Sequence, residues 1–113
     1  MTRRDPSADA DGATDTEADS DADPGVSPDV AARRLYDHLA ATAELPVERR
    51  ASRVLGEAEA VASDLRECEG RTRRERAAVV VDLLREIDGT GHADADDHVE
   101  EARTLAATLA ADP

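Results

Sequence analysis

Six arginines have the residue type and spacing to bind a phosphate group or another anion. They are Arg33, Arg34, Arg71, Arg73, Arg74 and Arg76. The last four crowd the start of a predicted helix, where the helix dipole is positive and Arg is unfavourable. Guanidinium groups bind carboxylates and phosphates bidentately. We therefore expect these arginines either to pair with carboxylates of the same chain or to form an anion-binding pole.

Pairing within the chain is the interpretation that we favour, with Asp64, Glu67 and Glu69 or an acidic N-terminal segment as partners. Binding of nucleic acid or another phosphate ligand at the anion-binding pole is the alternative. Six phosphate contacts would lose roughly five powers of ten in affinity between about 0.2 and 2 M salt. The single aromatic residue, Tyr36, also offers little surface for base stacking.

A second group of residues has the chemistry of a metal site. His92, Asp94 and His98 are close in sequence, and the last two are four residues apart, on one face of a helix. Their spacing matches no metal signature, and an EF-hand that begins at Asp88 would lack its Gly and its final Glu. We expect a capped, acid-rich helix start with no metal or cofactor, and metal binding by these three residues stays the alternative.

No catalytic motif is recognisable. Cys68 ends an apolar helical stripe, so we expect it to be a small buried hydrophobic residue. Its neighbours Glu67 and Glu69 disfavour a reactive thiolate. The sequence has no Gly-rich phosphate loop, nucleophile elbow or motif of paired carboxylates. The prediction is a protein that is not an enzyme.

The composition indicates where the chain works. All 14 basic residues are Arg, against 16 Asp and 11 Glu, and the formal net charge is −13. Such a surface suits concentrated salt, because the screening length falls to about 3 Å at 1 M and repulsion between carboxylates fades. The composition resembles that of proteins from the salt-loaded cytoplasm of halophilic archaea. A single Cys fits this cytoplasmic location, and no apolar run reaches the roughly 18 residues that cross a membrane.

The chain divides near Gly25. Residues 1–25 carry two Arg against eight acidic residues, a net charge of −6, and have no large apolar side chain except Met1. They are predicted to be a disordered acidic tail. Residues 26–113 are predicted to be one all-α domain, an antiparallel up-down bundle of four helices joined by short connections. The expected helices cover about 28–44, 46–69, 72–87 and 94–109, and the third has a capping box, Thr72 to Glu75.

The second of these helices carries the clearest pattern in the chain. Its apolar residues recur at alternating steps of four and three, which is the heptad spacing of a narrow seam between helices. The predicted seam comprises Val47, Ala51, Val54, Ala58, Val61 and Leu65. Because half of the helix's apolar stripe is small, a partner helix could approach closely. We expect the protein to act through this seam, by self-association or by binding a protein partner.

The segment Leu45-Pro46-Val47-Glu48-Arg49-Arg50 lies between two predicted helices, and an Arg-rich helix start follows. This order resembles that of small uncharacterised haloarchaeal helical proteins. The resemblance covers Ala31 to Leu109 and concerns helix lengths and the position of Pro46. It implies an all-helical fold and carries no functional residue over to this chain.

Overall fold

Four α-helices make up the part of the chain that the computed structural model describes, residues 26–112. Helix α2 spans Pro28–Thr42, α3 spans Arg49–Arg66, α4 spans Gly70–Leu84 and α5 spans Ala93–Ala111. No strand occurs in residues 26–112, so the prediction of an all-α fold of four helices is confirmed. The acidic tail predicted for residues 1–25 lies outside the described residues.

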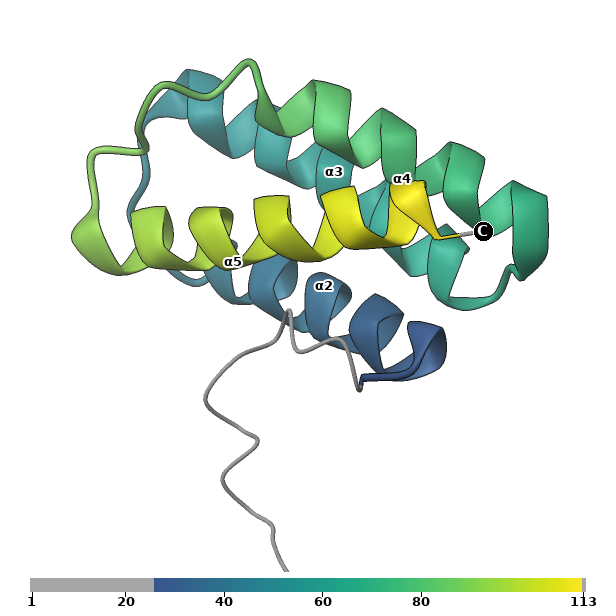
Figure 1. Ribbon diagram of the computed structural model, residues 1–113. Helices are drawn as coiled ribbons and strands as arrows, with labels where there is room; N and C mark the ends of the chain where they lie inside the picture. The colour runs from purple at the N-terminus through teal and green to yellow at the C-terminus, as the bar shows by residue number, and fades with distance from the viewer. Residues whose placement is uncertain (1–25, 113) are drawn as a thin grey trace, which may run out of the picture.

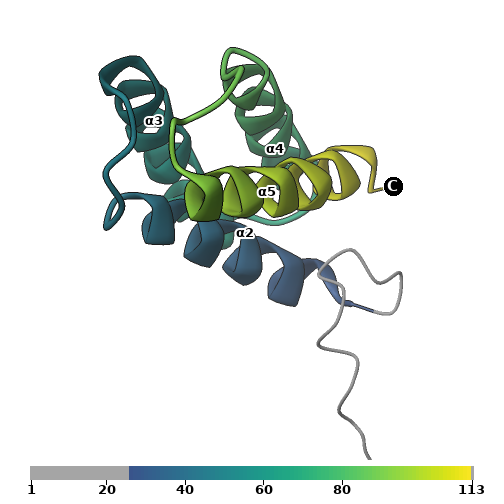
Figure 2. The ribbon, with the colours of Figure 1, turned by 90° about the vertical axis from the view of Figure 1, so that its left-hand side faces the viewer.

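The helices form a ring in which each one packs against two others. Both α2 and α4 contact α3 and α5. Figure 1 shows consecutive helices running back and forth along the bundle, and Figure 2 shows α3 and α4 side by side with α5 and α2 beneath them. At one end, the starts of α2 and α4 meet where Arg73 contacts Asp29. At the other end, the amide of Glu48 donates to the carbonyl oxygen of Thr90 and joins the starts of α3 and α5.

Alanine and leucine fill the space between the helices. Small side chains at the contact surfaces let the helix axes approach closely, and larger ones close the remaining volume. All four helices contribute fully buried large side chains: Leu35, Leu39, Leu65, Val80, Leu84, Leu105 and Leu109. None of the described helices is long and apolar enough to cross a membrane.

Side-chain caps fix the starts of three helices. Ser27 Oγ accepts a hydrogen bond from the amide of Val30 at the start of α2. At the start of α3, Glu48 Oε1 accepts from the amide of Ala51, and α3 therefore begins at Arg49 rather than at Pro46. His92 Nδ1 accepts from the amide of Ala95 in the same way, 3.4 Å away, at the start of α5. These caps satisfy amides that lack a partner within the first turn.

Helix α4 starts differently from the prediction. It begins at Gly70 and has no side-chain cap, so the predicted capping box is not formed and Thr72 lies within the first turn. Gly70 has φ +58°, a left-handed conformation that glycine adopts without strain. This turn leaves only residues 67–69 between α3 and α4. The helix also ends early, at Leu84, although Ile87 is still buried in the connection that follows.

Candidate functional site

The predicted seam lies inside the core of the chain itself. Its members on α3 face α2 and α4, which both pack against α3. Ala51, Val54, Ala58 and Leu65 are at most 5% exposed, and Val47 and Val61 are half-buried against the same core. The heptad spacing therefore reflects contacts within the chain, and this face of α3 is already covered.

Arg73 is the buried member of the arginine group, with 7% of the residue exposed. Its Nε and Nη2 donate to the carbonyl oxygens of Leu65 (3.1 Å) and Arg66 (3.3 Å), and its Nη1 pairs with Asp29 Oδ1 (2.9 Å). The guanidinium thus satisfies carbonyls at the end of α3 that lack donors within the helix. Its acidic partner is Asp29, and not one of the carboxylates near the end of α3 that the sequence suggested.

The other arginines of the predicted anion-binding pole are spread around their helices. Arg33, Arg71 and Arg76 are exposed, and Arg34 and Arg74 are half-buried. Successive residues of a helix turn by about 100°, so the arginines at the start of α4 point in different directions. A hollow of about 390 Å³ at this end is lined by Arg73 and Arg74 but also by three carboxylates, those of Asp29, Glu69 and Asp112. These carboxylates oppose the binding of an anion there.

His38 on α2 and His98 on α5 contact each other. Their Nδ1 atoms are 2.9 Å apart, and their ring centroids are 5.2 Å apart. Two rings whose Nδ1 atoms are 2.9 Å apart have their centroids farthest apart when both Nδ1 atoms lie on the line between the centroids. The observed centroid distance is close to that maximum, so the two Nδ1 atoms point toward each other. The geometry is that of an N–H···N hydrogen bond, in which one imidazole donates and the other accepts.

The predicted group of His92, Asp94 and His98 is not assembled into one site. His92 caps α5, His98 contacts His38, and the exposed Asp94 joins neither contact. Within residues 26–112, no three His, Cys, Asp or Glu side chains lie where they could hold a metal ion. Cys68 is half-buried, and its Sγ donates to the carbonyl oxygen of Asp64.

Asp96 joins the α4–α5 connection to the start of α5. Its Oδ1 accepts hydrogen bonds from the amide (2.9 Å) and the hydroxyl (2.8 Å) of Thr90, which is fully buried. The amide of Thr90, followed by its hydroxyl, lowers the pKa of the Asp96 carboxyl. Partial desolvation opposes this shift, and the positive charge of Arg103 adds to it. One residue of the acid-rich run, Asp96, thus holds the α4–α5 connection against the start of α5.

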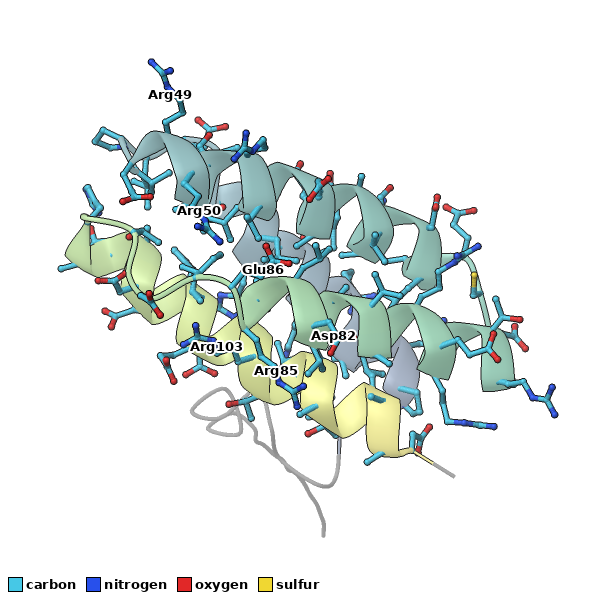
Figure 3. All side chains as sticks on the ribbon, turned by 90° about the horizontal axis from the view of Figure 1, so that it is seen from above. Arg49, Arg50, Asp82, Arg85, Glu86 and Arg103 are labelled. Carbon is cyan, nitrogen blue, oxygen red and sulfur yellow. The ribbon has the colours of Figure 1, made fainter. Side chains whose placement is uncertain are left out.

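Arg103 donates hydrogen bonds to carbonyl oxygens at the end of α4, as Arg73 does at the end of α3. From α5, its Nη2 donates to the carbonyl oxygens of Leu84 (3.0 Å) and Ile87, and its Nη1 pairs with Glu100 (2.7 Å). Figure 3 shows Arg103 reaching from α5 toward this end of α4. Sequence reasoning missed this role, because a lone Arg on a helix gives no signal that distant carbonyls need a donor.

One surface hollow is lined mainly by apolar side chains. It has a volume of about 340 Å³ and lies between α4 and α5. We call it the α4–α5 groove, and it is lined by Ala78, Val81, Asp82, Arg85, Ala107, Ala110 and Ala111. Val79, which follows Ala78 on α4, is 44% exposed and is the one exposed large hydrophobic residue in the described part of the chain. Exposed Ala is ordinary in helices, so no pattern in the sequence marks this surface.

A family model described as Domain of unknown function (DUF8152) matches residues 31–113. The chain belongs to this family. The match spans α3, α4 and α5 in full and all but the first three residues of α2, so the DUF8152 domain is the helical bundle itself. Searches of curated proteins and of solved structures find no match for the chain. Membership in a family of unknown function agrees with one part of the resemblance drawn from the sequence, the likeness to uncharacterised proteins.

Proposed function

We propose that this DUF8152 protein is not an enzyme and acts by binding another protein surface at the α4–α5 groove. The observation that carries the proposal is an exposed, apolar hollow of about 340 Å³ on a chain in which 36% of the residues are charged. A partner that covered this apolar surface would gain free energy from its burial. The floor consists of Ala78, Val81 and three alanines of α5, so a partner helix could approach both backbones closely.

The residues that could do chemistry support a non-catalytic function, because they are engaged in structural contacts. His38 and His98 contact each other, His92 caps α5, and Asp96 accepts two hydrogen bonds from Thr90. Cys68 follows the end of α3, whereas His92 precedes α5, and Figure 1 shows these helix ends at opposite ends of the bundle. A Cys–His pair for nucleophilic catalysis would have to bridge that distance.

We further propose that the association takes place in a salt-rich cytoplasm. The absence of Lys, the excess of Asp and the net charge of −13 support this setting. Apolar contact is the suitable driving force there, because molar salt screens contacts between exposed charges but does not weaken the burial of apolar surface. An apolar groove fits these conditions better than a cluster of arginines does.

Photo-cross-linking tests the proposed function. A benzophenone label is attached to Ala107→Cys in a Cys68→Ala background, and the labelled chain is irradiated in a high-salt extract of cells that express it. The matched control carries the label at Ala60→Cys, an exposed position on α3. We expect a discrete adduct from position 107 that Ala78→Arg abolishes, and no such adduct from position 60. Equal labelling from both positions, or an adduct that persists with Ala78→Arg, would refute binding at the groove.

A further inference from the structure

Two oppositely charged side chains flank the α4–α5 groove on the same turn of α4. Arg85 Nη1 lies 3.3 Å from Asp82 Oδ1, and both side chains are 75% exposed. Figure 3 shows both of them on α4, on the side that borders α5. An ion pair this exposed contributes little to the stability of one chain, so both groups can exchange partners at low cost.

We propose that the occupant of the α4–α5 groove is a second copy of this chain, related to the first by a two-fold axis; this inference rests on the proposed function. A two-fold interface brings one patch against itself, so the patch must be complementary to its own surface. We place the axis at right angles to α4, between residues 82 and 85, so that the two copies of α4 run in opposite directions. Asp82 of each copy then approaches Arg85 of the other, and two ion pairs form across the interface.

The shape of the groove fits the same occupant. Val81 and Ala78 on α4 and the three alanines on α5 form a surface without large protruding side chains. Because none of these side chains is large, the α4 helices of two copies can approach each other closely.

The net charge of the chain provides a way to distinguish a second copy from a basic protein as the occupant of the groove. Two chains of net charge −13 repel each other in dilute buffer, so their association strengthens as KCl screens the repulsion. Binding of a basic protein would instead weaken as salt rises. The sign of the salt dependence therefore identifies the class of occupant.

Sedimentation equilibrium of the purified full chain is the first test. At about 2 M KCl we expect twice the 12.0 kDa of one chain, and a dimer that weakens as salt is lowered. Ala78→Arg and Ala107→Arg should return the mass of one chain, because an unpaired charge would be buried in the interface. Ala60→Arg, the same change at an exposed position on α3, should leave the dimer intact. Circular dichroism checks that every variant is folded.

A charge exchange is the second and sharper test. Asp82→Arg alone and Arg85→Asp alone place like charges across the two-fold axis, and each should weaken the dimer about tenfold. Mixing the two variants sets two basic side chains of one chain against two acidic side chains of the other, so a mixed dimer of wild-type strength should form. A monomeric wild type at about 1 mM chain and 2 M KCl, or a mixture no stronger than its components, would overturn the two-fold dimer. A groove-specific cross-link to a different protein would then leave the proposed function standing.

Discussion

Arg73, in the first turn of α4, pairs with Asp29, in the first turn of α2, at a distance of 2.9 Å. The same guanidinium donates to two carbonyl oxygens at the end of α3. One buried side chain therefore joins three of the four helices at one end of the bundle. This role accounts for an Arg where the helix dipole disfavours it.

Replacing Arg73 should destabilise the fold more than replacing any exposed arginine near it. Arg73→Ala leaves the carbonyls of Leu65 and Arg66 without donors, which costs about 2–4 kcal/mol, or at least about 10 °C in Tm for a domain of this size. Arg73→Lys should recover only part of this loss, since an ammonium group cannot reproduce the fork of donors. Thermal melts followed by circular dichroism provide the measurement. Arg71→Ala is the control, and equal melting of Arg71→Ala and Arg73→Ala would contradict the role of Arg73.

The contact between His38 and His98 should appear as a coupling between α2 and α5. In a double-mutant cycle with His38→Ala and His98→Ala, we expect a coupling energy of about 1 kcal/mol, the value of one net hydrogen bond. The cycle is measured by chemical denaturation at neutral pH. A parallel cycle with His92→Ala and His98→Ala should be additive, because His92 caps α5 and does not contact His98. Additivity in both cycles would show that the imidazoles do not interact.

Asp96 should make the fold sensitive to acid. Its pKa is lowered in the folded state, so its carboxylate contributes stability above the unfolded pKa of about 3.9, and the contribution is lost as pH falls through the folded pKa. The difference in Tm between wild type and Asp96→Asn should therefore be full at neutral pH and shrink below about pH 4. The exposed neighbour Asp97, changed to Asn, is the control. A difference that stays constant down to about pH 2 would contradict the two hydrogen bonds from Thr90.

Low salt should weaken the bundle. With a net charge of −13, repulsion between carboxylates grows as the screening length rises from about 3 Å at 1 M to about 30 Å at 0.01 M. We expect the far-ultraviolet circular dichroism and the Tm to fall when the chain is dialysed from about 2 M into about 0.01 M KCl. Glu57→Gln with Glu101→Gln, both at exposed positions, should reduce the loss. A Tm that is the same in both buffers would show that screening plays no part in stability.

Periodicity predicted the helices because it depends only on local spacing. Apolar residues at steps of three and four mark the buried face of each helix, and Leu35, Leu65, Leu84 and Leu105 are indeed fully buried. The same spacing does not say which helix covers that face. For this reason the seam of α3 was expected to bind a partner, whereas α2 and α4 of the same chain cover it.

The contacts of long polar side chains could not be predicted from the sequence. Arg73 meets Asp29, 44 residues away, and Arg103 meets Leu84, 19 residues away. Both contacts depend on where the ends of α3 and α4 lie in space, which no local pattern encodes. The α4–α5 groove was missed for the same reason, since Val81 and Ala107 become neighbours of one hollow only after the helices pack.

The mobility of a nitroxide label at position 107 tests the proposed association most directly. The label is attached to Ala107→Cys in a Cys68→Ala background, and its electron paramagnetic resonance spectrum is recorded in high-salt cell extract beside that of Ala60→Cys. If the groove is an interaction site, the label at 107 is immobilised and Ala78→Arg releases it, while the label at 60 moves freely throughout. Equally free motion at 107 and 60 would mean that nothing binds the groove.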